Sequence, residues 1–284
     1  MDLKKYKIYL ENLYLFFLGI ISSFSLPPYN YWFVNFFTFS LLFIVLFKNK
    51  HKSLKFFFFY GYFFGFGYFV SNLYWIPLSF LHDENFKFLI PIAIVLIPAF
   101  LSLFYALAFF VFKLFFNFKA IFTNILTFSI ILGLFEFLRG SILSGFPWNL
   151  FAYSFSENLK IIQISSLIGI YAFNTIVITV FSVPSILYLN RKKNDLLGFF
   201  LIIILSIASY IYGNFKISAF KNLEIQKLSA EIKILSTNIS IERFYSNLDE
   251  EEILNKLIDL SNPNQQENTI YIWPEGVIPN INLV

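Results

Sequence analysis

Seven long apolar stretches fill most of the first 213 residues and restrict this chain to membrane architectures. An α-helix needs roughly 20 mostly apolar residues to cross a bilayer. Inside lipid, backbone polar groups must find partners within the protein, which favours helices. The sequence therefore predicts a polytopic α-helical domain with spans at residues 8–26, 31–47, 54–80, 86–116, 121–138, 161–189 and 195–213.

The composition agrees with this class. Hydrophobic residues make up 58% of the chain and charged residues 13%, and the mean hydropathy is +0.69, far from an ordinary globular protein. There is no cysteine, which excludes disulfides, thiolate metal sites and a cysteine nucleophile from these 284 residues. Pro91, Pro98 and Pro184 fall inside the apolar stretches and predict kinked helices.

Basic residues predict the orientation. Loops rich in Lys and Arg stay in the cytoplasm. One set of loops carries twelve such residues, and the opposite set holds only Lys87, Arg139 and Lys160. The N-terminus is then cytoplasmic, and seven crossings place residues 214–284 outside; a reporter fusion after Gly213 tests this. The twelve are Lys4, Lys5, Lys7, Lys48, Lys50, Lys52, Lys55, Lys113, Lys119, Arg191, Lys192 and Lys193. Because the basic excess is explained by topology, a nucleic-acid partner is not expected.

The last 71 residues form a second region with 10 acidic and 6 basic residues and no long apolar run. Residues 230–239 and 269–273 have the β-branched character of strands. Residues 248–260 between them show helical periodicity, with acidic residues in the first turn. This order predicts a β-α-β unit. Two strands and one helix are too few to bury a parallel sheet, so an exposed apolar edge prone to association is expected.

The second strand leads directly into Trp273-Pro274-Glu275. Proline cannot continue a parallel ladder, so Pro274 ends the strand and directs the following glutamate away from it. Open α/β sheets place their chemistry at the carboxyl ends of strands. On this pattern alone, a solvated loop glutamate is the simpler interpretation of Glu275.

Distant segments favour the catalytic interpretation. Residues 62–67 (Tyr-Phe-Phe-Gly-Phe-Gly) and 72–75 (Asn-Leu-Tyr-Trp) lie in and after the third span. Residues 136–140 (Glu-Phe-Leu-Arg-Gly) precede 144–148 (Ser-Gly-Phe-Pro-Trp). With Glu275, this ordered set resembles the bacterial apolipoprotein N-acyltransferases from about residue 12 to the end of the chain.

The resemblance implies a fold and a reaction. It implies a helical membrane domain at residues 1–213 and, at residues 214–284, the start of an extracytoplasmic nitrilase-like α/β domain, an αββα sandwich, in the bacterial inner membrane. The family moves an acyl chain from a phospholipid to the amino group of a diacylglyceryl-cysteine on an apolipoprotein. Its catalytic set is Glu-Lys-Cys, and the glutamate falls on Glu275. The implied partners are the phospholipid donor, the lipoprotein acceptor and the bilayer, and no cofactor is implied.

The lysine and cysteine of that set lie beyond Val284 in the family, so the 284 residues alone are expected to be inactive, with a C-terminal polypeptide completing the domain. Ser236 and Ser240 could replace the thiol as nucleophile only with a base beside them, and the sequence shows no recognisable base for either.

The family often carries a tryptophan in a mobile arm near the active site, and this position aligns loosely with Tyr245. The alternative interpretation of Tyr245 is an ordinary surface tyrosine. A non-catalytic membrane scaffold or transporter-like remnant is the competing hypothesis. The nucleotide sequence downstream of Val284 would discriminate between the two.

Two residue pairs and one short polar segment are further candidates for a functional role. Glu136 and Arg139 are three apart on one helical face, which predicts a structural ion pair that orients the next loop; headgroup binding is the alternative. Trp75 and Trp148 are expected at the outer interface, where aromatic residues anchor by default, with lipid binding as the functional alternative. His82-Asp83-Glu84 is interpreted as a solvated loop, and no metal site is predicted.

Overall fold

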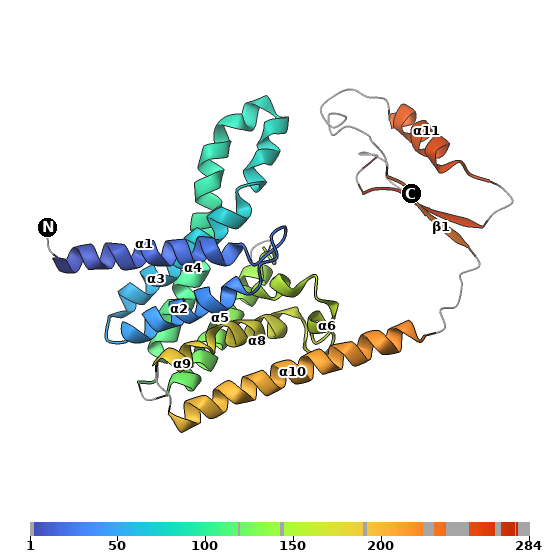
Figure 1. Cartoon of the computed structure of the whole chain (residues 1–284). Coiled ribbons are helices and arrows are strands. Elements are labelled where there is room, and N and C mark those ends of the chain that lie inside the picture. The colour runs from blue at the N-terminus through green and yellow to red at the C-terminus, as the bar shows by residue number, and fades with distance from the viewer. Residues whose placement is uncertain are drawn as a thin grey trace. The chain divides into compact units, whose positions relative to one another are not determined.

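A computed structural model describes residues 3–118, 120–142, 145–189, 192–223, 230–236, 250–264, 268–275 and 277. The chain divides into two compact units, Met1–Asn222 (unit 1) and Leu223–Val284 (unit 2). Unit 1 is helical and unit 2 contains the described strands (Figure 1).

The helices of unit 1 pack side by side as a bundle (Figure 1). Its longer helices are α1 (Leu3–Ser23), α2 (Val34–Lys48), α3 (Leu54–Leu73), α4 (Ile90–Leu114), α5 (Ile121–Ser141), α8 (Ile170–Ser182) and α10 (Lys193–Lys221). Short helical segments connect them: η1 (Ile76–His82), η2 (Glu84–Leu89), η3 (Phe151–Phe155), α6 (Leu159–Ile162), α7 (Ser165–Ile168) and α9 (Ser185–Leu189).

Within the described residues, four helical segments are long and apolar enough to cross a membrane. They are Glu84–Leu114, Ile121–Ser141, Ile170–Leu189 and Lys193–Lys221. Ile8–Ser23, Val34–Lys48 and Leu159–Ile168 are apolar but shorter. The polytopic helical character is thus confirmed, whereas the count of seven spans stays a prediction.

Three observed helices have limits that differ from the predicted spans. The predicted span 161–189 is divided at Gly169, whose φ of +79° lies in the left-handed region, and again near Pro184, before α9. The predicted span 54–80 changes from α-helix to 3₁₀-helix after Leu73. The last span was predicted to end at 213, but α10 continues to Lys221. Apolar character falls after Gly213, which ends the predicted span, but the backbone of α10 remains helical for eight more residues.

Glycines allow α3 to approach its neighbours closely. A Cβ atom on Gly67 would lie 2.0 Å from the carbonyl oxygen of Phe16 in α1, and one on Gly61 would lie 2.3 Å from that of Tyr105 in α4. These glycines therefore allow close helix packing. Around these contacts is a single core that includes the fully buried rings of Phe39, Phe43, Phe57, Phe64, Phe109 and Phe112.

Unit 2 contains the predicted β-α-β order. Strand β1 (Glu231–Ile234) pairs in parallel with β2 (Thr269–Ile272), and α11 (Glu250–Ser261) lies between them in sequence. Its buried apolar cluster consists of Ile253, Leu257 and Val277. Side chains alternate across a strand, so the register places four exposed isoleucines on one face. This open face comprises Ile232, Ile234, Ile270 and Ile272.

Candidate functional site

Glu275 follows the end of β2 by three residues and is exposed. The strand end is tied to α11 because Trp273 Nε1 donates a hydrogen bond to Ser261 Oγ at 3.0 Å. Ser261 Oγ in turn donates to the carbonyl oxygen of Leu257 at 2.7 Å. The carboxylate therefore extends from the carboxyl end of a parallel strand whose direction is held by a side-chain contact.

Glu136 and Arg139 form a buried ion pair in the last turns of α5, each about 1% exposed. Arg139 Nε donates to Glu136 Oε2 at 2.9 Å, and Nη2 donates to the same oxygen. The hydroxyl of Tyr105, from α4, donates to Glu136 Oε1. Both carboxylate oxygens are thus satisfied, as a charge removed from water requires.

The remaining donors of Arg139 hold the loop that follows α5. Nη1 donates to the carbonyl oxygen of Phe146 at 2.6 Å, and Nη2 donates to that of Trp148 at 2.8 Å. The hydroxyl of Tyr68, in α3, donates to the carbonyl oxygen of Asn149 at 2.8 Å. A planar guanidinium can form several such bonds at once, so one buried cation fixes the backbone of residues 146–148.

Trp75 and Trp148 stack on each other. Their ring centroids are 5.4 Å apart with an interplanar angle of 17°. The two side chains are 45% and 51% exposed. Trp75 follows α3 and Trp148 belongs to the loop held by Arg139, so the ion pair and the stacked rings are parts of one assembly at this end of the bundle.

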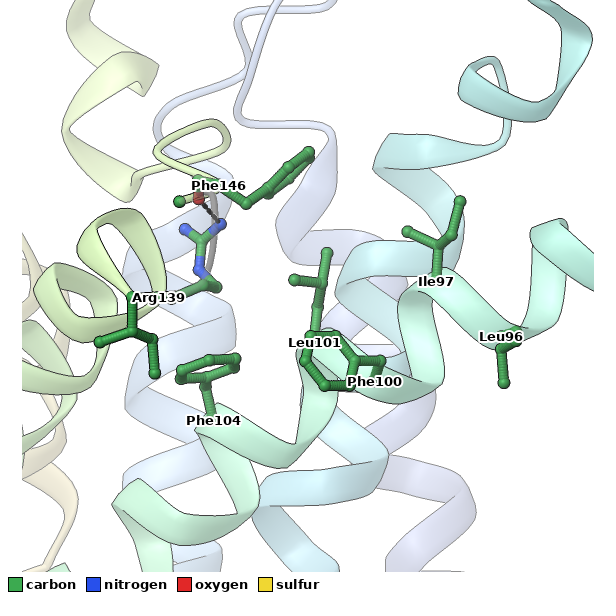
Figure 2. A pocket seen from close by; sticks show the side chains of 9 residues that line it. Leu96, Ile97, Phe100, Leu101, Phe104, Arg139 and Phe146 are labelled. Carbon is green, nitrogen blue, oxygen red and sulfur yellow. Dashed lines mark hydrogen bonds between the residues drawn. The ribbon is translucent and has the colours of Figure 1, made fainter.

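An apolar cavity of about 510 Å³ lies beside this assembly. Figure 2 shows Arg139 and Phe146 on one side and side chains of α4 on the other. Its lining residues are Leu96, Ile97, Phe100, Leu101, Phe104, Arg139, Ile142, Gly145 and Phe146. Because Arg139 is engaged by Glu136 and two backbone carbonyls, the walls offer mainly hydrocarbon surface to a ligand.

Two other predicted features have different outcomes. Tyr245 lies outside the described residues. In the His82-Asp83-Glu84 segment, Asp83 Oδ1 accepts a hydrogen bond from the backbone N–H of Asn85 at 2.9 Å, and Glu84 pairs with Lys87. Across the part of the chain that the structure describes, no three His, Cys, Asp or Glu residues gather as metal ligands.

Comparison with known proteins identifies the lineage. The family model for the apolipoprotein N-acyltransferase N-terminal domain matches residues 18–183. This chain belongs to the apolipoprotein N-acyltransferase family. The matched segment contains the ion pair and both stacked tryptophans, whereas Glu275 lies outside it.

Curated relatives named apolipoprotein N-acyltransferase extend the similarity. The protein of Rhodopseudomonas palustris is 29% identical over 275 residues, covering 92% of this chain and 50% of the relative. That of Bradyrhizobium diazoefficiens is 30% identical with the same coverage. The relative from Brucella melitensis is 29% identical over 226 residues. The chain thus spans about half the length of these curated relatives from Rhodopseudomonas palustris and Bradyrhizobium diazoefficiens.

The sequence pattern indicated Glu136 and Arg139 but not two tyrosines of the same assembly: Tyr105, which donates to Glu136, and Tyr68, which donates to the carbonyl oxygen of Asn149. Tyr105 and Tyr68 are fully or almost fully buried. A buried tyrosine hydroxyl usually has a hydrogen-bond partner, so a tyrosine within an apolar helix indicates that a polar group lies nearby. The stacking of Trp75 on Trp148 had no such signal, because it depends on how two distant loops meet.

Proposed function

We propose that this chain provides the membrane domain and the catalytic base of an apolipoprotein N-acyltransferase. The enzyme would transfer an acyl chain from a phospholipid to the α-amino group of a diacylglyceryl-cysteine at the N-terminus of a lipoprotein. Family membership supports the reaction class. The single observation that carries the catalytic role is Glu275, exposed just beyond the carboxyl end of a parallel strand.

The chemistry assigns Glu275 two proton transfers. In the first step its carboxylate removes a proton from a thiol, and the thiolate attacks the phospholipid ester carbonyl. A thioester forms, and the lysophospholipid leaves with the proton. In the second step the lipoprotein amine attacks the thioester, the carboxylate takes the amine proton, and the thiol is restored as the amide forms. A lysine stabilises the oxyanion in both steps.

The thiol must come from outside these 284 residues, and the family resemblance places the lysine there as well. The chain contains no cysteine, so it forms no acyl-thioester by itself. Unit 2 would be the opening of a nitrilase-like α/β sandwich, whose remaining strands and helices cover the open isoleucine face and supply both groups.

The membrane unit would deliver the lipids. The N-terminus would be cytoplasmic, and seven crossings in the bacterial inner membrane would bring unit 2 to the outer side. The cavity beside Arg139 suits an acyl chain, because its walls are mainly hydrocarbon. The stacked pair Trp75 and Trp148 suits the headgroup level, where amphipathic rings collect.

Complementation tests the proposal. The purified chain is combined with the half of the Rhodopseudomonas palustris relative that it does not match, together with phospholipid and a diacylglyceryl peptide. We expect the peptide to gain the mass of one acyl chain only when both polypeptides are present. Glu275→Gln should reduce that rate by roughly 10³-fold or more, since loss of one member of a catalytic unit removes most of its advantage.

Glu252→Gln is the matched control, because Glu252 is an exposed carboxylate on α11. It should leave the rate unchanged. Acyl transfer by the chain alone, in a preparation free of host enzyme, would refute the mechanism. A folded complex without transfer would favour the non-catalytic scaffold instead.

A further inference from the structure

A second cavity, of about 450 Å³, lies between the N-terminal halves of α1 and α3. These helices run in the same direction, because Glu11 contacts Lys52 and Tyr60 while Gly19 packs against the backbone of Phe64 and Tyr68. The cavity is therefore at the lysine-rich end of the bundle, whereas Trp75 and Trp148 lie beyond the other end of α3. Its lining residues are Ile8, Tyr9, Asn12, Lys55, Phe56, Phe59 and Phe63.

Two polar groups of this cavity, the Lys55 ammonium and Asn12 Oδ1, have no charged or hydrogen-bonding partner among the described residues, although Lys55 Nζ lies 6.0 Å from the centroid of the Phe59 ring. Lys55 is exposed, and among the described residues no carboxylate pairs with its ammonium group. Lys52, three residues earlier, is by contrast engaged by Glu11 and Tyr60. Asn12 Oδ1 is buried, and no described group donates a hydrogen bond to it. A buried acceptor without a donor is unfavourable, so this atom favours a ligand that carries one.

The remaining walls are apolar or aromatic. Phe56, Phe59 and Phe63 lie on successive turns of α3 and extend from Lys55 toward the middle of the helix. The arrangement is thus an exposed cation at the mouth and a buried acceptor inside, together with a hydrocarbon surface about two turns long. Free phosphate would use only the mouth, whereas a phospholipid would use both parts.

We propose that this cavity binds an anionic phospholipid whose headgroup carries hydroxyl groups, with phosphatidylglycerol as the representative ligand. The phosphodiester lies against the Lys55 ammonium, a headgroup hydroxyl donates to Asn12 Oδ1, and an acyl chain follows Phe59 and Phe63. The lysines at this end of the bundle, including Lys48 and Lys50, add long-range attraction for an anionic membrane surface. The proposal is independent of acyl transfer and assigns this lipid a resident role.

Native mass spectrometry of the full chain in detergent tests the site, with short-chain phosphatidylglycerol and phosphatidylcholine as probes. We expect the chain to retain phosphatidylglycerol preferentially. Lys55→Gln should weaken that retention roughly 5- to 10-fold, the effect of one lysine at an anionic lipid surface. Lys193→Gln is the control, since Lys193 is an exposed lysine at the start of α10 outside the cavity.

A second variant separates binding from folding. Asn12→Leu removes the orphan acceptor and adds apolar surface, so helicity by circular dichroism should be kept while the preference for phosphatidylglycerol falls. Equal retention of the two lipids would overturn the proposal, as would equal effects of Lys55→Gln and Lys193→Gln. Displacement of bound phosphatidylglycerol by millimolar inorganic phosphate at constant ionic strength would overturn it too, because the mouth alone would then be the site.

Discussion

Unit 1 and unit 2 bury their apolar side chains to very different extents. Unit 1 has one continuous core with several fully buried phenylalanines and a buried ion pair whose two carboxylate oxygens both accept hydrogen bonds. Unit 2 buries only Ile253, Leu257 and Val277 in its described part and exposes four isoleucines on one face of its strands. Lipid can cover the exposed apolar residues of a membrane helix, whereas an apolar sheet face in water must be covered by other protein segments.

The difference indicates where each unit finds its stability. Close contacts between helix backbones, such as that of Gly67 with Phe16, stabilise unit 1 internally. Parallel sheets are usually covered on both faces, so we expect further polypeptide to stabilise unit 2. Under the proposed function, catalysis is expected at unit 2, the unit with the smaller described core.

The largest stability effect is expected at the buried ion pair of unit 1. Arg139→Met leaves the Glu136 carboxylate buried without its cation and removes two backbone contacts, which should cost about 3–5 kcal/mol of unfolding free energy. Unfolding in mixed micelles of increasing denaturing-detergent content measures the loss.

Lys87→Met is the matched control, because it breaks the exposed Glu84–Lys87 pair at the same spacing. Its cost should be below about 1 kcal/mol. If the two variants lost equal stability, the contacts of Arg139 with Glu136 and with the loop at residues 146–148 would not stabilise unit 1 more than an exposed ion pair does.

A smaller effect is expected from crowding the helix contacts. Gly67→Ala would place a methyl group 2.0 Å from the carbonyl oxygen of Phe16, so α1 and α3 must separate at a cost of about 1–3 kcal/mol. Gly65→Ala is the control, since its nearest contacts are side-chain atoms of Tyr105 at 3.0 Å and longer. An equal loss in both variants, by the same unfolding assay, would mean that the glycine contact between α1 and α3 is not specific.

The smallest effect is expected on the open face of unit 2. Ile234 is 78% exposed, so Ile234→Thr should change the stability of the isolated chain by less than about 0.5 kcal/mol. Leu257→Ala, at a fully buried position, should instead abolish protection of the α11 amides against hydrogen exchange. A large loss from Ile234→Thr would show that this face is already covered in the chain alone.

Local pattern was enough to predict elements whose periodicity is strong. Residues 248–260 and 269–273 gave the helix and second strand of unit 2 within a few residues, because their apolar positions follow the helical and strand periods. The i,i+3 spacing of Glu136 and Arg139 correctly predicted that both side chains lie on one face of the helix. The break at Gly169 and the extension of α10 past Gly213 were missed, because hydropathy does not report where backbone geometry changes.

Contacts between distant segments could not be predicted in the same way. The hydroxyl of Tyr105 on Glu136 and the carbonyls of Phe146 and Trp148 on Arg139 depend on the packing of α4 and the loop after α5. Asn12 and Lys55 likewise line one cavity only because α1 and α3 run in the same direction. A single sequence contains no signal for such pairings beyond the cost of burying a polar group.

Hydrogen exchange at Thr269–Ile272 tests most directly the claim that unit 2 is completed by further polypeptide. In the chain alone, we expect these amides to exchange far faster than those in the core of α3, because the open face leaves β2 with little local stability. Adding the unmatched half of the Rhodopseudomonas palustris relative should slow their exchange by about 100-fold or more and leave α3 unchanged. Strong protection of Thr269–Ile272 in the monomeric chain alone would contradict the account.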